Sequence, residues 1–275
     1  MSGPVILAPL DGTSRALCAL PVARTFAELE DAPVRILHVT ERVVPLSETA
    51  HLLGVDAAAL RGATLESRAG DPGDAILRAA ADNRARLIVL CTHTAEACPE
   101  GGIGRTAVAV LRGAPCPVVL VDPACPMAGW RLERLLVPHE GSPSVSDALR
   151  PAAALARKAG AELIVLQVAD SADGQESGSM APPVYMDQPQ HEWPAWAAEF
   201  MQRLASICPL EDLRVRLLVR CGDPADETLR VAAEESADLI VLAWKGDWAP
   251  ARAATFKAVL RDAPCPLMVM RVPVA

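Results

Sequence analysis

A glycine-rich segment in the first half of this 275-residue chain has the composition of an anion site. The segment is Gly101-Gly-Ile-Gly-Arg105, at the start of a stretch near Ile103–Arg112 that we expect to be helical. Glycines let backbone N–H groups approach a phosphate closely. The start of a helix attracts anions, and the planar fork of an arginine can clamp phosphate oxygens. The residues therefore predict that a phosphate-bearing ligand binds near Arg105. The alternative is that 101–104 is simply a flexible loop, since short glycine motifs have low specificity.

Other chemistries lack the residues that they require. The sequence has no paired carboxylates and no nucleophile–base pattern, so we name no catalytic residue. It has no C-x-x-C pair and no zinc-type Cys/His spacing, so we name no metal ligand. The 8 cysteines are expected to be reduced and mostly buried, as in a cytosolic protein. This predicts a cytoplasmic protein that is not an enzyme.

Charge and hydropathy exclude two classes of partner. The net charge is -8 and lysine and arginine form no cluster, which argues against a nucleic-acid partner. No apolar run approaches the roughly 18–20 residues of a membrane span, so we expect no membrane partner. The acidity of the whole chain does not exclude a local anion site at Arg105, because the attraction for an anion depends mainly on the charged groups nearest to it.

The chain repeats one pattern twice. Gly70-Asp-Pro72 recurs as Gly222-Asp-Pro224, and Ala114-Pro-Cys-Pro117 recurs as Ala263-Pro-Cys-Pro266. Pro9 corresponds to Pro138, 129 residues later, whereas the Gly-Asp-Pro motif recurs after 152 residues, which indicates an insertion near 171–193. A period this long is not that of a solenoid. We therefore expect two domains, 1–124 and 130–275, joined by a proline-containing linker.

Each copy alternates short apolar runs with amphipathic stretches, which is typical of a parallel sheet covered by helices on both faces. The strands expected in the first copy are Val5–Ala8, Val34–Val39, Leu65–Arg68, Leu87–Cys91 and Val118–Val121, with helices near Ser14–Leu29, Leu46–Leu60, Pro72–Asn83 and Ile103–Arg112. The strands expected in the second are Leu135–Val137, Leu163–Val168, Val215–Val219, Leu239–Ala243 and Leu267–Arg271, with helices near Ser144–Lys158, Trp193–Ile207, Pro224–Glu235 and Arg252–Arg261. Pro21 and Pro151 fall inside the first helix of each copy, which predicts a kink or a late start.

Ligands of open α/β sheets bind beyond the carboxyl ends of the strands, at the topological switch point. In the first copy the loops at that place are 9–14 and 91–106. The motifs Pro9-Leu-Asp11, Leu37-His-Val39, Gly70-Asp-Pro72 and Ala114-Pro-Cys-Pro117 give the chain its resemblance to a tandem universal stress protein, over nearly all of both halves. The resemblance implies an α/β fold of two Rossmann-like, adenine-nucleotide α-hydrolase-like domains. Each would have a five-stranded parallel sheet with helices on both faces.

The resemblance also implies a nucleotide site. Some family members bind ATP through a loop of the form G-x-x-G, nine residues, then G-[S/T]. Gly104 occupies the last glycine position here, while Cys91 and Thr94 replace the first two glycines and Arg105 replaces the hydroxyl residue. ATP, with Mg²⁺, is the implied cofactor, and the implied nucleotide-binding residues are Pro9, Leu10, Asp11, Val39, Cys91, His93, Thr94, Gly104, Arg105 and Thr106.

The second copy departs further from this loop. Ala243 and Gly246 replace its first two glycines, Glu140 replaces the aspartate, and Trp244 and Trp248 crowd a shorter loop. We expect the second copy to have lost the site. Two functions stay open: a stress-response module that binds ATP or AMP in its first domain, or a scaffold that has lost nucleotide affinity and binds a small ligand or partner. Slow ATP hydrolysis would be incidental.

Several other residues have structural interpretations. We expect His38 to lie near the end of its strand, exposed or hydrogen-bonded rather than catalytic, and Cys116 and Cys265 to be repeat-equivalent packing residues. Trp193, Trp196 and Phe200 are expected to form the apolar face of a helix, and the alternative is that they line a ligand or partner surface together with the loop 171–193. Because single-domain relatives dimerise through their last strand, the resemblance implies that Val118–Val121 pairs with Leu267–Arg271 in an intramolecular pseudo-dimer, with a homodimer of the chain as a further possibility.

Overall fold

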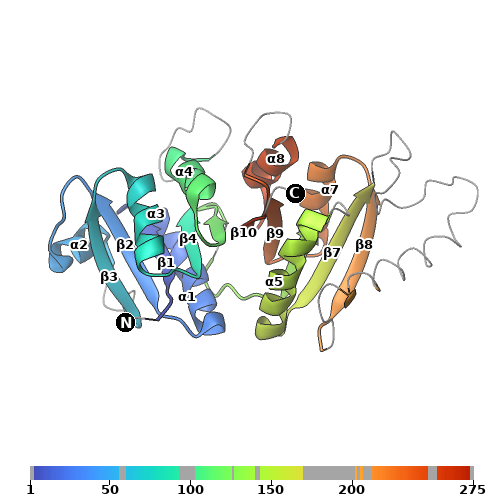
Figure 1. Cartoon of the computed structure of the whole chain (residues 1–275), viewed down its shortest axis with the longest axis horizontal. Coiled ribbons are helices and arrows are strands. Elements are labelled where there is room, and N and C mark those ends of the chain that lie inside the picture. Colours follow the sequence, from blue (N-terminus) through green and yellow to red (C-terminus); the bar gives the residue numbers. More distant parts are fainter. Residues whose placement is uncertain are drawn as a thin grey trace, which may run out of the picture. The chain divides into compact units, whose positions relative to one another are not determined.

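The computed structural model describes residues 3–55, 60–92, 103–125, 127–139, 143–169, 202, 205–206, 212–246 and 253–272. The chain divides into two compact units (Figure 1). The first comprises Met1–Arg131 and Cys265–Arg271, and the second comprises Leu132–Pro264 and Val272–Ala275. The expected insertion at 171–193 and the aromatic residues 193–200 lie outside the described residues.

The first unit is built on a parallel sheet. Its strands lie in the order β3-β2-β1-β4-β5, and β10 pairs with β5 in antiparallel direction. Ile6 of β1 pairs with Val34 of β2 on one side and with Leu87 of β4 on the other. The elements of this unit are β1 (Ile6–Leu10), the 3-10 helix η1 (Ala16–Cys18), α1 (Ala19–Glu30), β2 (Val34–Thr40), α2 (Leu46–Leu52), β3 (Ala63–Ala69), α3 (Pro72–Asp82), β4 (Leu87–Cys91), α4 (Arg105–Gly113), β5 (Val118–Val121) and β10 (Leu267–Arg271).

The second unit repeats this arrangement. Its described strands are parallel and lie in the order β9-β6-β7-β8. Its elements are β6 (Arg134–Pro138), α5 (Pro143–Ala159), β7 (Glu162–Ala169), β8 (Val215–Cys221), α7 (Pro224–Glu234), β9 (Leu239–Trp244) and α8 (Ala254–Asp262). The fifth strand expected for the second copy, Leu267–Arg271, is β10, which is grouped with the first unit and pairs with β5.

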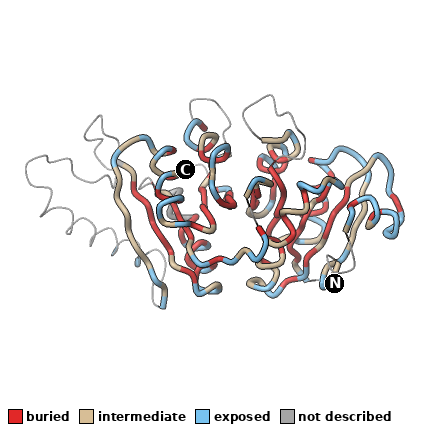
Figure 2. The backbone as a smooth tube through the Cα atoms, turned by 180° about the vertical axis from the view of Figure 1, so that it is seen from behind, coloured by how far each residue is buried: buried red, intermediate tan, exposed pale blue. Residues whose placement is uncertain are grey.

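The central strands are covered on both faces. Ile6, Leu7 and Ala8 are consecutive and each is 0% exposed. Neighbouring residues of a strand point to opposite faces, so burial of all three requires packing on both. In Figure 2 the buried backbone follows these inner strands, while the outer strands β3 and β8 are only half-buried. The α/β fold class with a mostly parallel sheet is therefore confirmed.

The predicted helix near Ser14–Leu29 starts late, as Pro21 led us to expect. The chain first forms η1 and then α1, which begins at Ala19, so that Pro21 lies in the first turn. A proline there removes no helical hydrogen bond, because the first N–H groups have no partner within the helix. In α5, by contrast, Pro151 lies inside the helix. The predicted helix Leu46–Leu60 is shorter than expected, since α2 ends at Leu52.

The repeated Gly-Asp-Pro motif is a strand-to-helix turn with a built-in cap. Gly222 has φ +145°, a conformation that favours glycine, and Pro224 occupies the first turn of α7. The Asp223 carboxylate accepts hydrogen bonds from the backbone N–H groups of Ala225, at 2.8 Å, and Asp226, at 3.0 Å. In the first unit Asp71 accepts from the Asp74 N–H, at 3.1 Å. The motif thus satisfies N–H groups that a helix start leaves without a helical partner.

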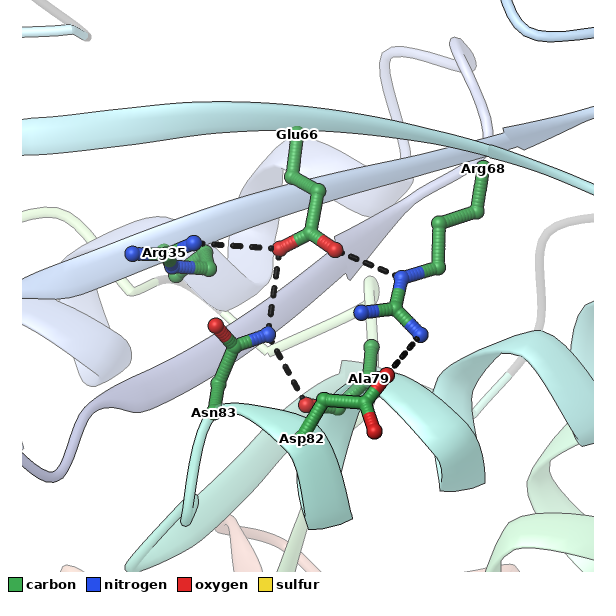
Figure 3. Close-up of polar contacts among 6 residues, drawn as sticks. All are labelled: Arg35, Glu66, Arg68, Ala79, Asp82 and Asn83. Carbon is green, nitrogen blue, oxygen red and sulfur yellow. Dashed lines mark hydrogen bonds and ion pairs between the residues drawn. The ribbon is translucent and has the colours of Figure 1, made fainter. Parts of the chain in front are cut away.

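An ionic cluster ties the edge strand β3 to its neighbours (Figure 3). The Glu66 carboxylate accepts hydrogen bonds from Arg68 at 2.5 Å, from Asn83 at 3.1 Å and from Arg35 of β2 at 3.3 Å. Arg68 also reaches Asp82 at the end of α3, at 2.7 Å. Burial alone would raise the pKa of Glu66, but the hydrogen bonds from the arginines and Asn83 outweigh it and hold that pKa below 4.5.

Asp223→Ala should lower the free energy of unfolding by about 1 kcal/mol, because the first N–H groups of α7 lose their acceptor. Urea denaturation followed by circular dichroism measures this. Asp223→Asn is the matched control, since an asparagine oxygen accepts the same bonds, and it should unfold close to the parent protein. Equal losses in both variants would contradict a capping role.

Lowering the pH should remove the contribution of Glu66. A carboxylate with a depressed folded pKa stabilises fully above its unfolded pKa, and this contribution is lost as the pH falls through the folded value, here below 4.5. Glu66→Gln should therefore be less stable than the parent at about pH 7, with a difference that shrinks towards about pH 3. Urea denaturation at both pH values tests this, with the exposed Glu41→Gln as control. A difference for Glu66→Gln that is independent of pH would contradict it.

Candidate functional site

The loop after β1 is organised by an aspartate turn. Asp11 is exposed directly after the strand, and its Oδ1 accepts hydrogen bonds from the Thr13 backbone N–H at 2.9 Å and from the Thr13 hydroxyl at 2.8 Å. The Thr13 carbonyl then accepts the Ala16 N–H at 3.2 Å, which starts η1. The local bonds fix the Asp11 carboxylate at the carboxyl end of β1, which is where the sequence predicted it.

The ends of β1 and β2 are held together by His38. Its ring is buried, and Nδ1 lies 2.9 Å from the Leu10 carbonyl oxygen. A carbonyl can only accept, so Nδ1–H donates. Of the two expectations for His38, the hydrogen bond is present, whereas the side chain is buried and not exposed. Val39, the next residue, is half-buried near the end of β2, and the preceding residues Leu37 and His38 pair with Pro9 and Leu10.

Gly12 is required by a close backbone approach. It has φ +90°, and a Cβ placed on it would lie 2.8 Å from the carbonyl oxygen of Leu52, at the end of α2. The loop that carries Asp11 therefore packs directly on the helix that follows β2. The sequence does not predict this contact, because Gly12 and Leu52 are far apart in the chain. The positive φ that favours glycine at position 12 is seen only in the structure.

The end of β4 is tied to the start of α4. Cys91 is the last residue of β4, and the next residue, Thr92, donates its backbone N–H to Val121 at 2.9 Å. The Thr92 carbonyl accepts the N–H of Gly104 at 3.0 Å. Gly104 precedes α4, and Arg105 and Thr106 form the first turn, with Arg105 exposed. The predicted site residues His93 and Thr94 lie outside the described residues.

The start of α4 differs from that of α3. Asp71 caps α3 through its side chain, whereas no side chain among the described residues caps α4. The first turn of α4 carries no acidic residue, and it carries the cationic Arg105. A Cβ at Gly104 would lie 3.3 Å from the Thr92 carbonyl oxygen, so glycine allows the close approach seen here. The N–H groups of a first helical turn and the Arg105 guanidinium make this helix start electropositive.

Topology brings these residues to one edge of the sheet. β1 pairs in parallel with β2 and β4, so the carboxyl ends of all three strands lie on the same side. The short helix η1 contacts β4, which places the Asp11 loop against the strand that ends at Cys91. The residues that the structure gathers at this edge are Pro9, Leu10, Asp11, Val39 and Cys91, with Gly104, Arg105 and Thr106 joined to them through Thr92.

The corresponding edge of the second unit has a different lining. His139 and Gln167 stand where the first copy has Leu10 and His38, and both are buried. Trp244 at the end of β9 is 4% exposed, and its ring stacks on Phe256 of α8 with centroids 5.5 Å apart and an interplanar angle of 11°. Aromatic side chains therefore occupy the space between the end of β9 and the first turn of α8. Glu140 and Trp248 lie outside the described residues.

Neither a metal cluster nor a membrane span is found in the part of the chain that the structure describes. No group of three or more His, Cys, Asp and Glu side chains there is arranged to hold a metal ion. No helix among the described residues has the length and apolar character to cross a membrane.

The comparisons with known proteins agree on one family. Its model, described as the universal stress protein family, matches residues 4–122 and 131–271. The "Universal stress protein in QAH/OAS sulfhydrylase 3'region" of Thermus aquaticus is 32% identical over 132 residues, which cover 42% of this chain and 96% of that protein. Each copy of the repeat is therefore similar to the family's domain.

Two solved structures share the fold. A universal stress protein from Archaeoglobus fulgidus superposes with a TM-score of 0.67 at 19% identity, over 99% of this chain and 97% of that one. A putative universal stress protein from Pseudomonas aeruginosa gives a TM-score of 0.69 at 17% identity, over 98% and 93% of the respective chains. At these identities the likeness concerns the fold.

Gly12→Ala should destabilise the chain by about 1–3 kcal/mol, because it combines a strained φ with a collision against the Leu52 carbonyl. Gly54→Ala is the matched control, since Gly54 also has a positive φ but has open space around its Cβ position. Urea denaturation of both variants separates the two costs. A Gly12 variant no less stable than the Gly54 variant would show that the contact is unimportant.

Proposed function

The chain belongs to the universal stress protein family, and we propose that its first domain binds an adenine nucleotide, ATP or AMP, as part of a stress response. The observation that carries the proposal is the start of α4. It has no side-chain cap among the described residues, it carries Arg105, and Gly104 ties it to the edge that holds Asp11. Such a helix start is a favourable place for a phosphate.

Each part of the nucleotide has matching chemistry at this edge. Asp11 offers a carboxylate acceptor for ribose hydroxyl groups, and half-buried Val39 offers an apolar contact for the base. The backbone N–H groups of the first turn of α4 and the Arg105 guanidinium suit the phosphates. Mg²⁺ would accompany ATP as a charge-neutralising ion on the phosphates.

The loss of the first family glycine is compatible with binding. The Cys91 side chain is only 7% exposed and shares a hydrogen bond with the Cys18 thiol. Its thiol therefore packs into the protein interior rather than into the loop through which a phosphate would approach. This supports a site that keeps its function with altered loop geometry.

The proposed role is binding and signalling rather than turnover. Nucleotide occupancy would change the affinity of the protein for a partner in the cytoplasm, through the loops at the edge of the first sheet. Slow hydrolysis of ATP would be incidental to this role. The pseudo-dimer of the two domains and a homodimer of the chain belong to the same proposal, as they rest on the family resemblance.

The second domain supports a different function, as a scaffold without nucleotide. The stack of Trp244 on Phe256 fills the place next to the end of β9, and buried Gln167 replaces His38. If the first domain also lacked affinity, the whole chain would act through protein or small-ligand contacts. Nucleotide titration distinguishes the two functions directly.

Isothermal titration of the whole chain with ATP and Mg²⁺, and with AMP, should show one site per chain. Arg105→Ala and Asp11→Ala should each weaken binding about tenfold or more, since each removes a charged hydrogen-bonding group. Arg61→Ala removes an exposed arginine just before β3, at the opposite edge of the sheet, and should leave affinity unchanged. Mass spectrometry of small molecules released from the purified protein gives a second readout.

Absence of heat at millimolar nucleotide, with no nucleotide retained on purification, would overturn the proposal in favour of the scaffold. Equal weakening by Arg61→Ala would show that the titration reports net charge rather than a site.

A further inference from the structure

Two cysteine side chains meet beneath the edge of the first sheet. Cys18 ends η1, Cys91 ends β4, and these two elements contact each other. The two thiols share a hydrogen bond, and neither residue is in a disulfide in this structure. Residues distant in the sequence thus place two thiols within hydrogen-bonding reach of each other at the point where η1 packs on β4.

The pair is not explained by a packing need common to both copies. At the offset of 129 residues that holds for the front of the repeat, Cys18 corresponds to Asp147. At the offset of 152 residues that relates the two Gly-Asp-Pro motifs, Cys91 corresponds to Ala243. The second copy therefore has neither thiol. Cys116 behaves differently, since its counterpart in the second copy is also a cysteine, as expected for a residue kept for packing.

The surroundings keep the Cys18 thiol protonated at neutral pH. The hydrogen bond to Cys91 and burial raise the pKa of the Cys18 thiol well above its ordinary value of 9.0, and the neighbouring Asp122 and Cys125 raise it further. Burial and the charge of Asp122 also raise the pKa of Cys125. Thiols in this state react slowly with mild oxidants, because the thiolate is the nucleophile. Once one sulfur is oxidised, its neighbour is already in place to attack it.

We propose that Cys18 and Cys91 are a redox-modification site that closes to a reversible disulfide when a hydroperoxide oxidises the protein. One thiol loses its proton, and its sulfur attacks the terminal peroxide oxygen, forming a sulfenic acid and releasing an alcohol, or water when the oxidant is hydrogen peroxide. The second thiol then attacks the sulfenic sulfur, forming the S–S bond and releasing water. In total the thiols lose two electrons and two protons, and the peroxide O–O bond takes them up.

The disulfide would link three parts of the first domain. It joins η1, and through Thr13 the Asp11 loop, to the end of β4, while Thr92 connects Cys91 to Gly104 through its backbone. A cross-link between residues so far apart in the chain restricts the unfolded state strongly. Disulfides in cytosolic proteins are usually catalytic or redox-sensing, which suits a site that is a dithiol at rest. The inference does not depend on whether a nucleotide binds.

Peptide mapping of the full chain tests it. The protein is treated with hydrogen peroxide, its remaining thiols are alkylated, and it is digested with trypsin without reductant. Mass spectrometry should find the peptide Ala16–Arg24, which contains Cys18, joined to Leu87–Arg105, which contains Cys91 and Cys98. Dithiothreitol should reverse the link. The oxidised parent should also melt several degrees higher than the reduced parent.

Single substitutions identify the sulfur atoms. Cys18→Ser and Cys91→Ala should each lose both the link and the rise in melting temperature on oxidation, whereas Cys98→Ser and Cys116→Ala should keep both. Serine retains a hydrogen-bonding group at the half-buried position of Cys18, and Ala243 shows that the repeat accepts alanine at the position of Cys91. Circular dichroism of the reduced variants checks that each is folded.

Three results would overturn the proposal. Cys18 could stay fully alkylatable after peroxide treatment, or Cys98→Ser could lose the link. Cys18 could also be joined instead to Gly113–Arg131, the peptide that contains Cys116 and Cys125. Because the first and third results are read on the parent protein, they hold whether or not every variant folds.

Discussion

The position of β1 between β2 and β4 is the constraint on which the first domain depends. The connection after β1 runs to β2 on one side, whereas the connection after the neighbouring strand β4 runs to β5 on the other side. The loop after β1 and the loop after β4 therefore turn away from each other and leave a gap at the carboxyl ends of these two strands. Hydrogen bonds then shape that gap: His38 joins β2 to β1, and Thr92 joins β4 to α4. The strand order therefore determines where the candidate site lies, and these hydrogen bonds determine how its residues are positioned.

Local patterns in the sequence were sufficient for most of the elements and for one of the turns. The Gly-Asp-Pro motif predicts a helix start at Pro72, and Pro21 predicts the late start of α1, because both depend on near neighbours. Contacts between distant segments could not be predicted in this way. Neither the approach of Gly12 to Leu52 nor the meeting of Cys18 and Cys91 leaves a trace in spacing or composition. Family resemblance located Asp11 and Gly104, but their partners Thr13 and Thr92 emerged only from the geometry.

The two domains preserve their sheets and helices and diverge at the edges formed by the carboxyl ends of their strands. Arg68 pairs with Asp82 in the first domain, and Arg220 pairs with Glu234 at the corresponding positions of the second, at 2.7 and 3.5 Å. Both pairs join the outermost strand of a sheet to the end of the following helix, which protects an edge strand against misplaced pairing. The first domain adds Glu66, where the second has Leu218 and instead places Arg216 between Glu162 and Glu235. In both domains, ion pairs thus attach the outermost strand to the helix that follows it, but the surrounding charged residues differ.

The pairing of β10 with β5 has a consequence for the order in which the molecule can assemble. β5 ends at Val121, whereas β10 begins at Leu267, so its partner strand is synthesised only after β6, β7, β8 and β9. Until then β5 is an apolar strand with one open edge, of the kind that recruits strands from other chains. The first sheet therefore cannot be completed until β10 has been synthesised. The open edge of β5 must be kept from pairing with other strands while the second domain is translated.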